Sequence, residues 1–262
     1  MSVLNLNYSI FIPLYNADSF IESFCKNILI QANEPDQIVF IDDGENSDNI
    51  FNKIKEHFKN FKNVDLVFIK NKKNLGPCKS WNNSRKFFRN KLVFRMDADD
   101  LWRKDHTTVM LNSYALNKTY LLYHQNSKPS FFKSFFYNNE KIFVNTAQHS
   151  SFMFNLDICD LKYPTINNYP YDDLFLLYKI RFILKKKIKI VNENTCIIQT
   201  HFDNRFSLKQ DKKSRFFLRK LFFLFLKKKL LIKKVKCLYF YKIFLHFNFL
   251  QSIFIIIKIF FK

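Results

Sequence analysis

The sequence predicts an α/β fold, in which an open and mostly parallel sheet is flanked by helices. Short apolar runs of strand-forming residues alternate with segments whose apolar residues recur at helical spacing. This alternation favours parallel strands joined by right-handed crossovers. Three of the apolar runs are followed by polar or acidic clusters, and such sheets bind ligands beyond the carboxyl ends of their strands. We therefore expect a binding site at that edge.

The first three predicted elements are a strand, a helix and a strand. The run YSIFI at 8–12 predicts a strand that Pro13 ends, because proline donates no backbone hydrogen bond to a sheet. Residues 19–30 have apolar side chains at helical spacing, and Ser19 is a suitable N-cap for that helix. The run QIVFI at 37–41 predicts a second, buried strand.

A second helix and a third strand follow the cluster Asp42-Asp43-Gly44. Ser47 or Asp48 is expected to cap a helix that runs to about residue 61. The run VDLVFI at 64–69 predicts the third strand.

A turn and a third helix lead to the fourth strand. The turn is Asn74-Leu75-Gly76-Pro77, and Pro77 fits the first position of a helix over 78–88. The run KLVFRM at 91–96 predicts a strand that ends at Asp97. Beyond Asp105 the pattern is less regular. The remaining candidates are a helix over 107–116, strands near 120–123, 142–144 and 151–154, a helix over 172–184, and a final hairpin or pair of strands at 188–191 and 196–199.

Glycine is scarce, since the 262 residues include 34 Phe but only 2 Gly. Glycine is preferred where the backbone needs a positive φ or must approach another group closely. Gly44 and Gly76 lie after a predicted strand and before a predicted helix, where α/β enzymes build ligand sites. Both are therefore candidates for the binding site.

The net charge of +21 is concentrated at the end of the chain. Residues 212–262 contain 14 Lys or Arg and no acidic residue, so only +7 is left for residues 1–211. The apolar runs of this basic segment are shorter than the roughly 20 residues of a spanning helix. We expect amphipathic helices on an anionic membrane surface, with a spanning segment or ordinary packing helices as alternatives. The chain then divides into an α/β domain at 1–211 and a basic tail at 212–262.

The location predicted for the chain is the cytoplasm, at the inner face of the plasma membrane. The first 13 residues lack the basic region and cleavage site of a signal peptide, so we expect none. The five cysteines are far apart and show no metal-binding spacing, which favours free thiols in a reducing compartment.

Asp97, Asp99 and Asp100 directly follow the fourth strand. Carboxylates this close repel one another unless a cation shares them, and hard oxygen ligands suit Mg²⁺ or Mn²⁺. A divalent ion there can neutralise the diphosphate that leaves a nucleotide sugar. The structural alternative is a solvated acidic turn that caps the next helix. The position after a fourth parallel strand favours the metal site.

Three further groups have both a functional and a structural interpretation. Asp42-Asp43-Gly44 suits hydrogen bonds to a base or ribose, or a tight turn. Asp172-Asp173 opens a predicted helix, where a carboxylate can act as a general base or simply complement the helix dipole. His201 can offer a neutral nitrogen to a metal, or serve a structural role.

Five segments occur in the order and spacing of a known enzyme family. They are SIFIPLYN at 9–16, IVFIDDGENSD at 38–48, NLGPCKSWN at 74–82, VFRMDADDLW at 93–102 and YDDLFLL at 171–177. Over about residues 5–205 the chain resembles the family 2 glycosyltransferases, which have the Rossmann-like GT-A fold. The resemblance implies transfer of a sugar from a nucleotide-diphosphate sugar to an acceptor hydroxyl.

The resemblance also implies roles for matching residues. It makes Asp173 the catalytic base and Asp99 a metal ligand, with His201 near the metal and diphosphate. The nucleotide-sugar-binding residues that it implies are Pro13, Tyr15, Asp42, Asp43, Gly44, Asn74, Gly76, Lys79, Asp97 and Ala98.

The expected reaction is an inverting transfer that depends on Mn²⁺ or Mg²⁺ and favours a UDP-sugar. The expected acceptor is a saccharide or a lipid-linked saccharide of the cell surface, and no nucleic acid is expected as a partner. Two alternatives are a basic nucleic-acid-binding protein and a catalytically inactive, membrane-bound relative. Leu14 and Asp172 depart from the family pattern, in which a small hydroxyl residue and Glu are usual, and leave the donor sugar and acceptor open.

Overall fold

The computed structural model divides the chain into two units, Met1–Thr200 and His201–Lys262. All described residues belong to the first unit. They are residues 6–61, 63–125, 134–137, 140–143, 149–163, 176–177, 179–180 and 184–197, with the backbone alone at 134–137 and 140–143. The predictions for Asp172, Asp173, His201 and the basic tail lie outside these residues, as does most of the helix predicted over 172–184.

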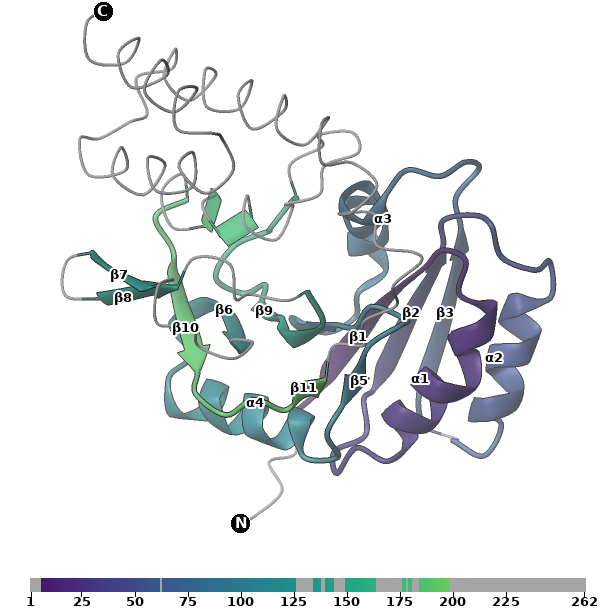
Figure 1. Cartoon of the computed structure of the whole chain (residues 1–262), viewed down its shortest axis with the longest axis horizontal. Coiled ribbons are helices and arrows are strands. Elements are labelled where there is room, and N and C mark those ends of the chain that lie inside the picture. Colours follow the sequence, from purple (N-terminus) through teal and green to yellow (C-terminus); the bar gives the residue numbers. More distant parts are fainter. Residues whose placement is uncertain are drawn as a thin grey trace, which may run out of the picture. The chain divides into compact units, whose positions relative to one another are not determined.

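A seven-stranded sheet forms the centre of the described part, in the order β10-β6-β9-β4-β1-β2-β3 (Figure 1). The neighbours β3, β2, β1 and β4 are all parallel, as are β6 and β10. Only β9 runs antiparallel to its neighbours β4 and β6 within this described sheet, so the prediction of a mostly parallel sheet is confirmed. The strands are β1 (Tyr8–Leu14), β2 (Gln37–Asp42), β3 (Asp65–Lys70), β4 (Leu92–Arg95), β6 (Tyr120–Gln125), β9 (Met153–Asn155) and β10 (Lys187–Val191).

Two short antiparallel pairs accompany this sheet. β5 (Leu101–Trp102) pairs with β11 (Cys196–Ile197), and β7 (Ser134–Tyr137) pairs with β8 (Glu140–Phe143). β5 directly follows the acidic cluster in the sequence. Its pairing with β11 brings a segment almost one hundred residues later next to β5.

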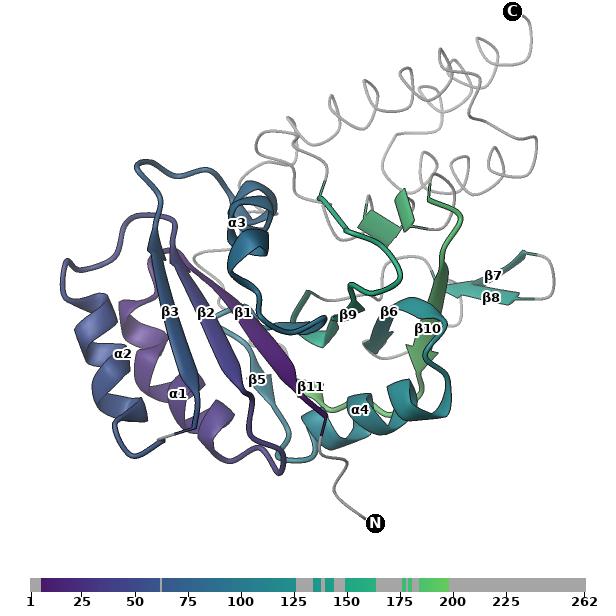
Figure 2. The same ribbon diagram turned by 180° about the vertical axis from the view of Figure 1, so that it is seen from behind.

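Helices cover both faces of the sheet, as the two opposite views show (Figures 1 and 2). Alternate residues of β1 point to opposite faces, so Ile10 and Ile12 pack with Phe24 of α1, whereas Phe11 packs with Trp81 of α3. In the described part, no helix is long and apolar enough to cross a membrane. The helices are α1 (Ile21–Leu29), α2 (Ile50–Phe58), α3 (Pro77–Ser84) and α4 (His106–Leu116), with short 3-10 turns η1 (Asp18–Phe20), η2 (Arg85–Phe87) and η4 (His149–Ser151).

Both predicted helix caps were wrong. A 3-10 turn precedes α1, so Phe20 and not Ser19 stands at its N-cap, without a side-chain cap. Asn49 precedes α2, and Ser47 bonds instead to the Asp18 carboxylate through its N–H at 2.7 Å and its hydroxyl. Ser47 therefore bonds to Asp18 of a distant loop and does not cap α2.

Two strand predictions also need correction. β1 continues through Pro13 to Leu14, with Pro13 beside Ile41 in the register. The two late strands do not pair with each other, because β10 pairs with β6 and β11 pairs with β5. Their partners are distant in sequence, so local pattern could not identify them.

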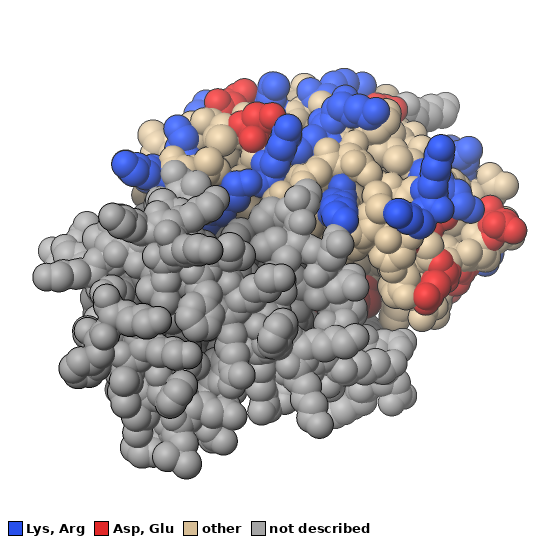
Figure 3. Space-filling view, turned by 90° about the horizontal axis from the view of Figure 1, so that it is seen from above, with Lys and Arg blue, Asp and Glu red and all other residues tan. Residues whose placement is uncertain are grey.

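Charged side chains are mixed over the visible part of the described surface. Figure 3 shows Lys and Arg across this face with Asp and Glu among them. The described residues thus show no purely basic surface in this view.

Candidate active site

The loops after β1 and β2 are joined by the side chain of Asn46. Its amide nitrogen donates to the Leu14 carbonyl oxygen at 3.0 Å and to Asp42 Oδ1 at 2.6 Å. Its amide oxygen accepts from the Ala17 N–H at 2.8 Å, and the Asp43 N–H donates to the Leu14 carbonyl oxygen at 2.8 Å. The carboxyl ends of both strands therefore form one connected edge.

The backbone at this edge is left-handed at three positions. The φ angle is 48° at Asn16, 106° at Gly44 and 55° at Glu45. Such conformations are unfavourable for residues with a Cβ, and they concentrate at ligand sites. Nothing lies within 4 Å of a Cβ built on Gly44. The backbone angle, and not crowding, is therefore what favours glycine there.

Asp42, predicted to line the nucleotide base, is only 2% exposed. Its Oδ1 accepts from the Gly44 N–H at 2.9 Å and from Asn46, and its Oδ2 lies 3.6 Å from Lys70 Nζ. Lys70 stands opposite Asp42 in the parallel register of β2 and β3. The carboxylate is therefore held within the edge, with a lysine to balance its charge.

Asp43 connects this edge to the beginning of α3. Its Oδ1 accepts from Asn71 Nδ2 at 2.9 Å and from the Leu75 N–H at 2.8 Å, and its Oδ2 accepts from the Gly76 N–H at 2.8 Å. The carboxylate thus lies at the N-terminus of α3, where the helix dipole favours a negative charge. Asp43 anchors the loop that carries Asn74 and Gly76.

That loop ends at Gly76 with φ 80° and ψ 161°, a conformation that is essentially restricted to glycine. Asn74 is exposed, and its Oδ1 accepts from the Gly76 N–H at 3.0 Å. Pro77 takes the first position of α3, as predicted. Lys79 lies half-buried in the first turn of the helix.

Tyr15 brings a third loop to this group. It is 48% exposed, and its phenol interacts with the side chains of Glu45 and Asn74. The neighbouring Glu45 carboxylate raises the pKa of Tyr15. Pro13 lies half-buried two residues earlier in β1. The structure therefore brings together predicted donor-binding residues from the ends of β1 and β2 and from the start of α3.

The acidic cluster lies after β4 and is tied to η4. Ser150 Oγ accepts from the Asp97 N–H at 2.8 Å and donates to Asp100 Oδ2 at 2.6 Å. Asp100 is 6% exposed and Ala98 is buried, whereas Asp99 is exposed. The three carboxylates thus have different environments, with Asp100 turned inward and Asp99 at the surface.

Asp97 is paired with Arg95, the last residue of β4. Arg95 Nε and Nη2 both lie 3.1 Å from Asp97 Oδ1. Arg95 is 1% exposed, and its Nη1 donates to Tyr163 Oη at 3.2 Å. His149 Nδ1 lies 3.9 Å from Asp97 Oδ2, and burial together with the nearby Arg95 charge holds the pKa of His149 well below its usual value. His149 is therefore neutral near pH 7, and Arg95 carries the positive charge.

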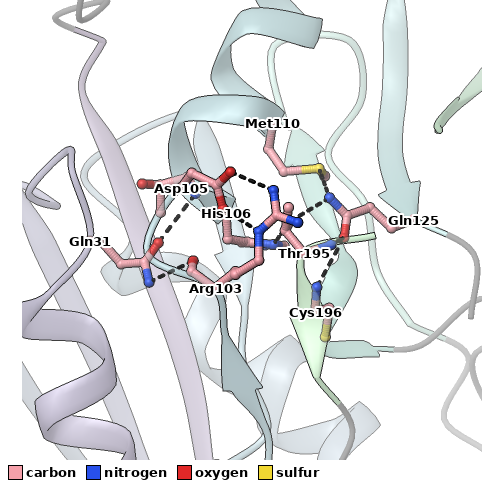
Figure 4. Close-up of polar contacts among 9 residues, drawn as sticks. Gln31, Arg103, Asp105, His106, Met110, Gln125, Thr195 and Cys196 are labelled. Carbon is pink, nitrogen blue, oxygen red and sulfur yellow. Dashed lines mark hydrogen bonds and ion pairs between the residues drawn. The ribbon is translucent and has the colours of Figure 1, made fainter. Parts of the chain in front are cut away.

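Gln125 holds the start of β11 and the residue before it (Figure 4). Gln125 Oε1 accepts from the Thr195 N–H at 2.8 Å and the Cys196 N–H at 3.1 Å, and its Nε2 donates to Thr195 Oγ1 at 2.7 Å. His106 Nδ1 lies 2.7 Å from the same hydroxyl oxygen. Burial raises the pKa of Cys196, and the nearby Asp100 and Asp97 raise it further. The thiol thus lies within electrostatic reach of the cluster.

The described acidic side chains fit one mode of divalent metal binding. Among the described residues, no group of three or more His, Cys, Asp or Glu side chains gathers to hold a metal. Mg²⁺ is commonly held by one or two carboxylates together with waters and substrate phosphates, and does not need a cage of protein ligands. The exposed Asp99 can supply such an oxygen.

Several residues of this region were missed from the sequence. Asn46, Asn71 and Ser150 were missed because each makes hydrogen bonds to another loop, which a local pattern does not show. Arg95 did have one, since a charged residue in the otherwise apolar run LVFRM of a central strand must be paired when it is buried.

The chain belongs to the family described as Glycosyl transferase family 2, whose model matches residues 9–168, more than half of the sequence. This agrees with the resemblance found in the motifs. The match ends before Asp173 and His201.

Two curated relatives carry the same kind of description. The chain is 32% identical over 103 residues to an "uncharacterized glycosyltransferase" of Rickettsia conorii, which covers 39% of this chain and 16% of that protein. It is 28% identical over 121 residues to another from Mycoplasma genitalium, which covers 44% of this chain and 39% of that protein. The chain therefore spans well under half of the length of these relatives.

Solved structures share the fold. The mannosyltransferase PcManGT from Pyrobaculum calidifontis, in complex with GDP-Man and Mn²⁺, aligns with a TM-score of 0.62 and 16% identity, over 80% of this chain and 61% of that chain. Residues 1–349 of TarS from S. aureus, in complex with UDP-GlcNAc, align with a TM-score of 0.60 and 16% identity, over 82% of this chain and 65% of that chain. The expected GT-A fold is confirmed.

Proposed function

We propose that this protein transfers a sugar from a nucleotide-diphosphate sugar, preferably a UDP-sugar, to an acceptor hydroxyl. Family membership supports the reaction class. The observation that carries the site assignment is the gathering of predicted donor-binding residues at the ends of β1 and β2 and at the start of α3, with the acidic cluster after the neighbouring β4.

In the proposed reaction, each group of residues has one task. Pro13, Tyr15 and the edge formed by Asp42, Asp43 and Gly44 bind the nucleotide, and Asn74, Gly76 and Lys79 bind the diphosphate side of the donor. Asp97 and Ala98 lie against the ribose or sugar.

The proposed cofactor is Mn²⁺ or Mg²⁺, which Asp99 and, by the resemblance, His201 would hold. When bound, such an ion supplies positive charge that stabilises the departing nucleoside diphosphate. The structure of PcManGT with GDP-Man and Mn²⁺ supports a divalent ion in this fold. Asp173 takes the proton of the acceptor hydroxyl as a general base. Direct attack of that hydroxyl on the anomeric carbon inverts the configuration.

The proposed setting is cell-surface glycan synthesis at the inner face of the plasma membrane. The support is the composition of residues 212–262, where 14 basic residues alternate with apolar runs. An acceptor on a lipid carrier suits this location. We propose a catalytic domain at 1–211 and a membrane-associated tail at 212–262.

Calorimetry with a panel of UDP-, GDP- and dTDP-sugars, each with and without Mn²⁺, tests the donor site. The complexes of TarS and PcManGT with UDP-GlcNAc and GDP-Man define two donor classes to compare. We expect Mn²⁺-dependent binding of a UDP-sugar, and its loss in Asp99→Ala. Glu56→Gln, which removes an exposed carboxylate from α2, is the matched control. If no donor binds in the presence of Mn²⁺, the inactive relative is the better interpretation.

A further inference from the structure

We infer that Arg95 is a positioning residue of the donor site, which orients the Asp97 carboxylate and balances part of the charge of the acidic cluster. The inference rests on the proposed function, in which Asp97 contacts the donor.

The position of Arg95 in the sheet is unusual for a charged residue. β4 lies between β1 and β9, and all four of its residues are buried. Because side chains alternate along a strand, Arg95 points to the same face as Val93, which packs in the apolar cluster of Trp81 and Phe154. An apolar residue could fill this place without the loss of hydration that a guanidinium suffers. A compensating role for the charge is therefore expected.

The contacts of Arg95 fix its guanidinium on two sides. One edge presents Nε and Nη2 to Asp97 Oδ1, each at 3.1 Å. The other edge presents Nη1 to Tyr163 Oη at 3.2 Å, and the guanidinium carbon lies 5.6 Å from the centre of the Tyr163 ring. A planar group held on both edges gives its partner a defined orientation. The Asp97 side chain is still 29% exposed, so it stays accessible.

Charge balance gives Arg95 a second effect. Asp97, Asp99 and Asp100 contribute three negative charges when ionised, and Arg95 contributes one positive charge. A divalent ion then brings the group to neutrality, which favours a donor that carries its own diphosphate charge. Without Arg95, the same group with its ion is negative and repels the diphosphate, while its attraction for the ion is at least as strong.

Loss of Arg95 should weaken donor binding but not Mn²⁺ binding. This difference separates a positioning role from a purely structural one. In Arg95→Met we expect the KM for the donor sugar to rise about tenfold or more, the scale of a lost charged hydrogen bond. The Mn²⁺ concentration for half-maximal activity should stay the same or fall. Damage to the fold of the site would instead weaken both the donor and Mn²⁺.

The chain offers a matched control in Arg103→Met. Arg103 and Asp105 have the same spacing as Arg95 and Asp97 and also form an ion pair through Nε and Nη2, but Arg103 is 53% exposed. Its substitution should leave both constants unchanged. Arg95→Lys keeps the charge but not the two-edged contact, and we expect a donor KM between those of the wild type and Arg95→Met. Arg95→Lys also provides a second measurement of the donor KM if Arg95→Met does not fold.

Two results would overturn the inference while the wild type is active. One is a donor KM that equals the wild-type value in both Arg95 variants. The other is a parallel loss of donor and Mn²⁺ affinity in Arg95→Met or, if that variant does not fold, in Arg95→Lys. If the wild type turns over no nucleotide sugar at all, the proposed function itself fails, and the inference fails with it.

Discussion

At the scale of single residues, Asp43 shows how a predicted ligand-binding group also holds the chain together. Its carboxylate accepts hydrogen bonds from Asn71, Leu75 and Gly76, which come from the loop between β3 and α3. The side chain is almost fully buried. We therefore expect Asp43 to affect donor binding chiefly through the loop that it positions.

Substitution of Asp43 by Asn is expected to destabilise the protein. In Asn an amide NH₂ replaces one carboxylate oxygen, so a donor group faces the N–H of Leu75 or of Gly76, and the negative charge that strengthens both hydrogen bonds is lost. We expect a loss of about 2–4 kcal/mol in the free energy of unfolding, measured by urea denaturation. Asp48→Asn is the matched control, because Asp48 is fully exposed and pairs only loosely with Lys70. Equal stability of the two variants would contradict the anchoring role.

The burial of His106 leads to a prediction about how the stability of the protein depends on pH. It is fully buried against the Trp102 ring, and burial lowers the pKa of His106 to about 3. The unfolded chain, with a histidine pKa near 6.5, therefore binds a proton that the folded protein does not bind between about pH 6.5 and 3. Stability from this group is complete above pH 6.5 and is lost as the pH falls, by at most about 1.4 kcal/mol per pH unit.

The measurement is the free energy of unfolding from pH 7 to pH 4, for the wild type and His106→Asn. The variant should be less stable at pH 7, because it loses the ring contact. The unfolding free energy of the variant should also fall less steeply as the pH decreases. The difference in slope should correspond to about one bound proton. Identical slopes would show that His106 is not the group responsible.

At the scale of elements, Gln125 attaches β11 to the end of β6 through three hydrogen bonds. In Gln125→Met the buried N–H groups of Thr195 and Cys196 lose their acceptor. We expect a loss of about 2–4 kcal/mol in unfolding free energy, and faster amide hydrogen exchange at these two positions than in the wild type. Arg103→Met, which breaks an exposed ion pair beside the same network, should change stability by about 1 kcal/mol or less. Unchanged exchange in Gln125→Met would contradict the attachment.

The elements that could be predicted are those with a local signal. The strands β1 to β4 and the helices between them follow from the spacing of apolar residues, and Pro77 marks the start of α3. The helix start at Ser19 was wrong because a 3-10 turn precedes α1, and the cap at Ser47 was wrong because Ser47 bonds to the distant Asp18. β5 and β11 are short, and their pairing joins residues that lie almost one hundred positions apart.

The residues of the candidate site also divide into those with a local signal in the sequence and those without one. The acidic cluster and Asp42-Asp43-Gly44 were predictable, because residue type and position after a strand are local properties. Their partners were not, since the contact between Asp97 and Ser150 spans 53 residues. The tasks proposed for Asp173 and His201 stay predictions that rest on the resemblance.

At the scale of the whole molecule, charge separates the two predicted parts of the chain. Residues 212–262 carry +14 of the net +21. We expect the full chain to sediment with vesicles that contain anionic lipid, and to do so less in a variant with Lys227, Lys228 and Lys229 changed to Gln. Vesicles of zwitterionic lipid are the control. Tighter binding to single-stranded DNA than to anionic vesicles would support the nucleic-acid alternative instead.

The most direct test of the central claim is release of nucleoside diphosphate from nucleotide sugars by the whole 262-residue chain. We predict release from a UDP-sugar that needs Mn²⁺ or Mg²⁺, stops with EDTA, and is lost in both Asp99→Ala and Asp173→Asn while each variant unfolds at the wild-type temperature. Release that is unaffected by EDTA and by both substitutions would contradict a metal-dependent glycosyltransferase built on these residues.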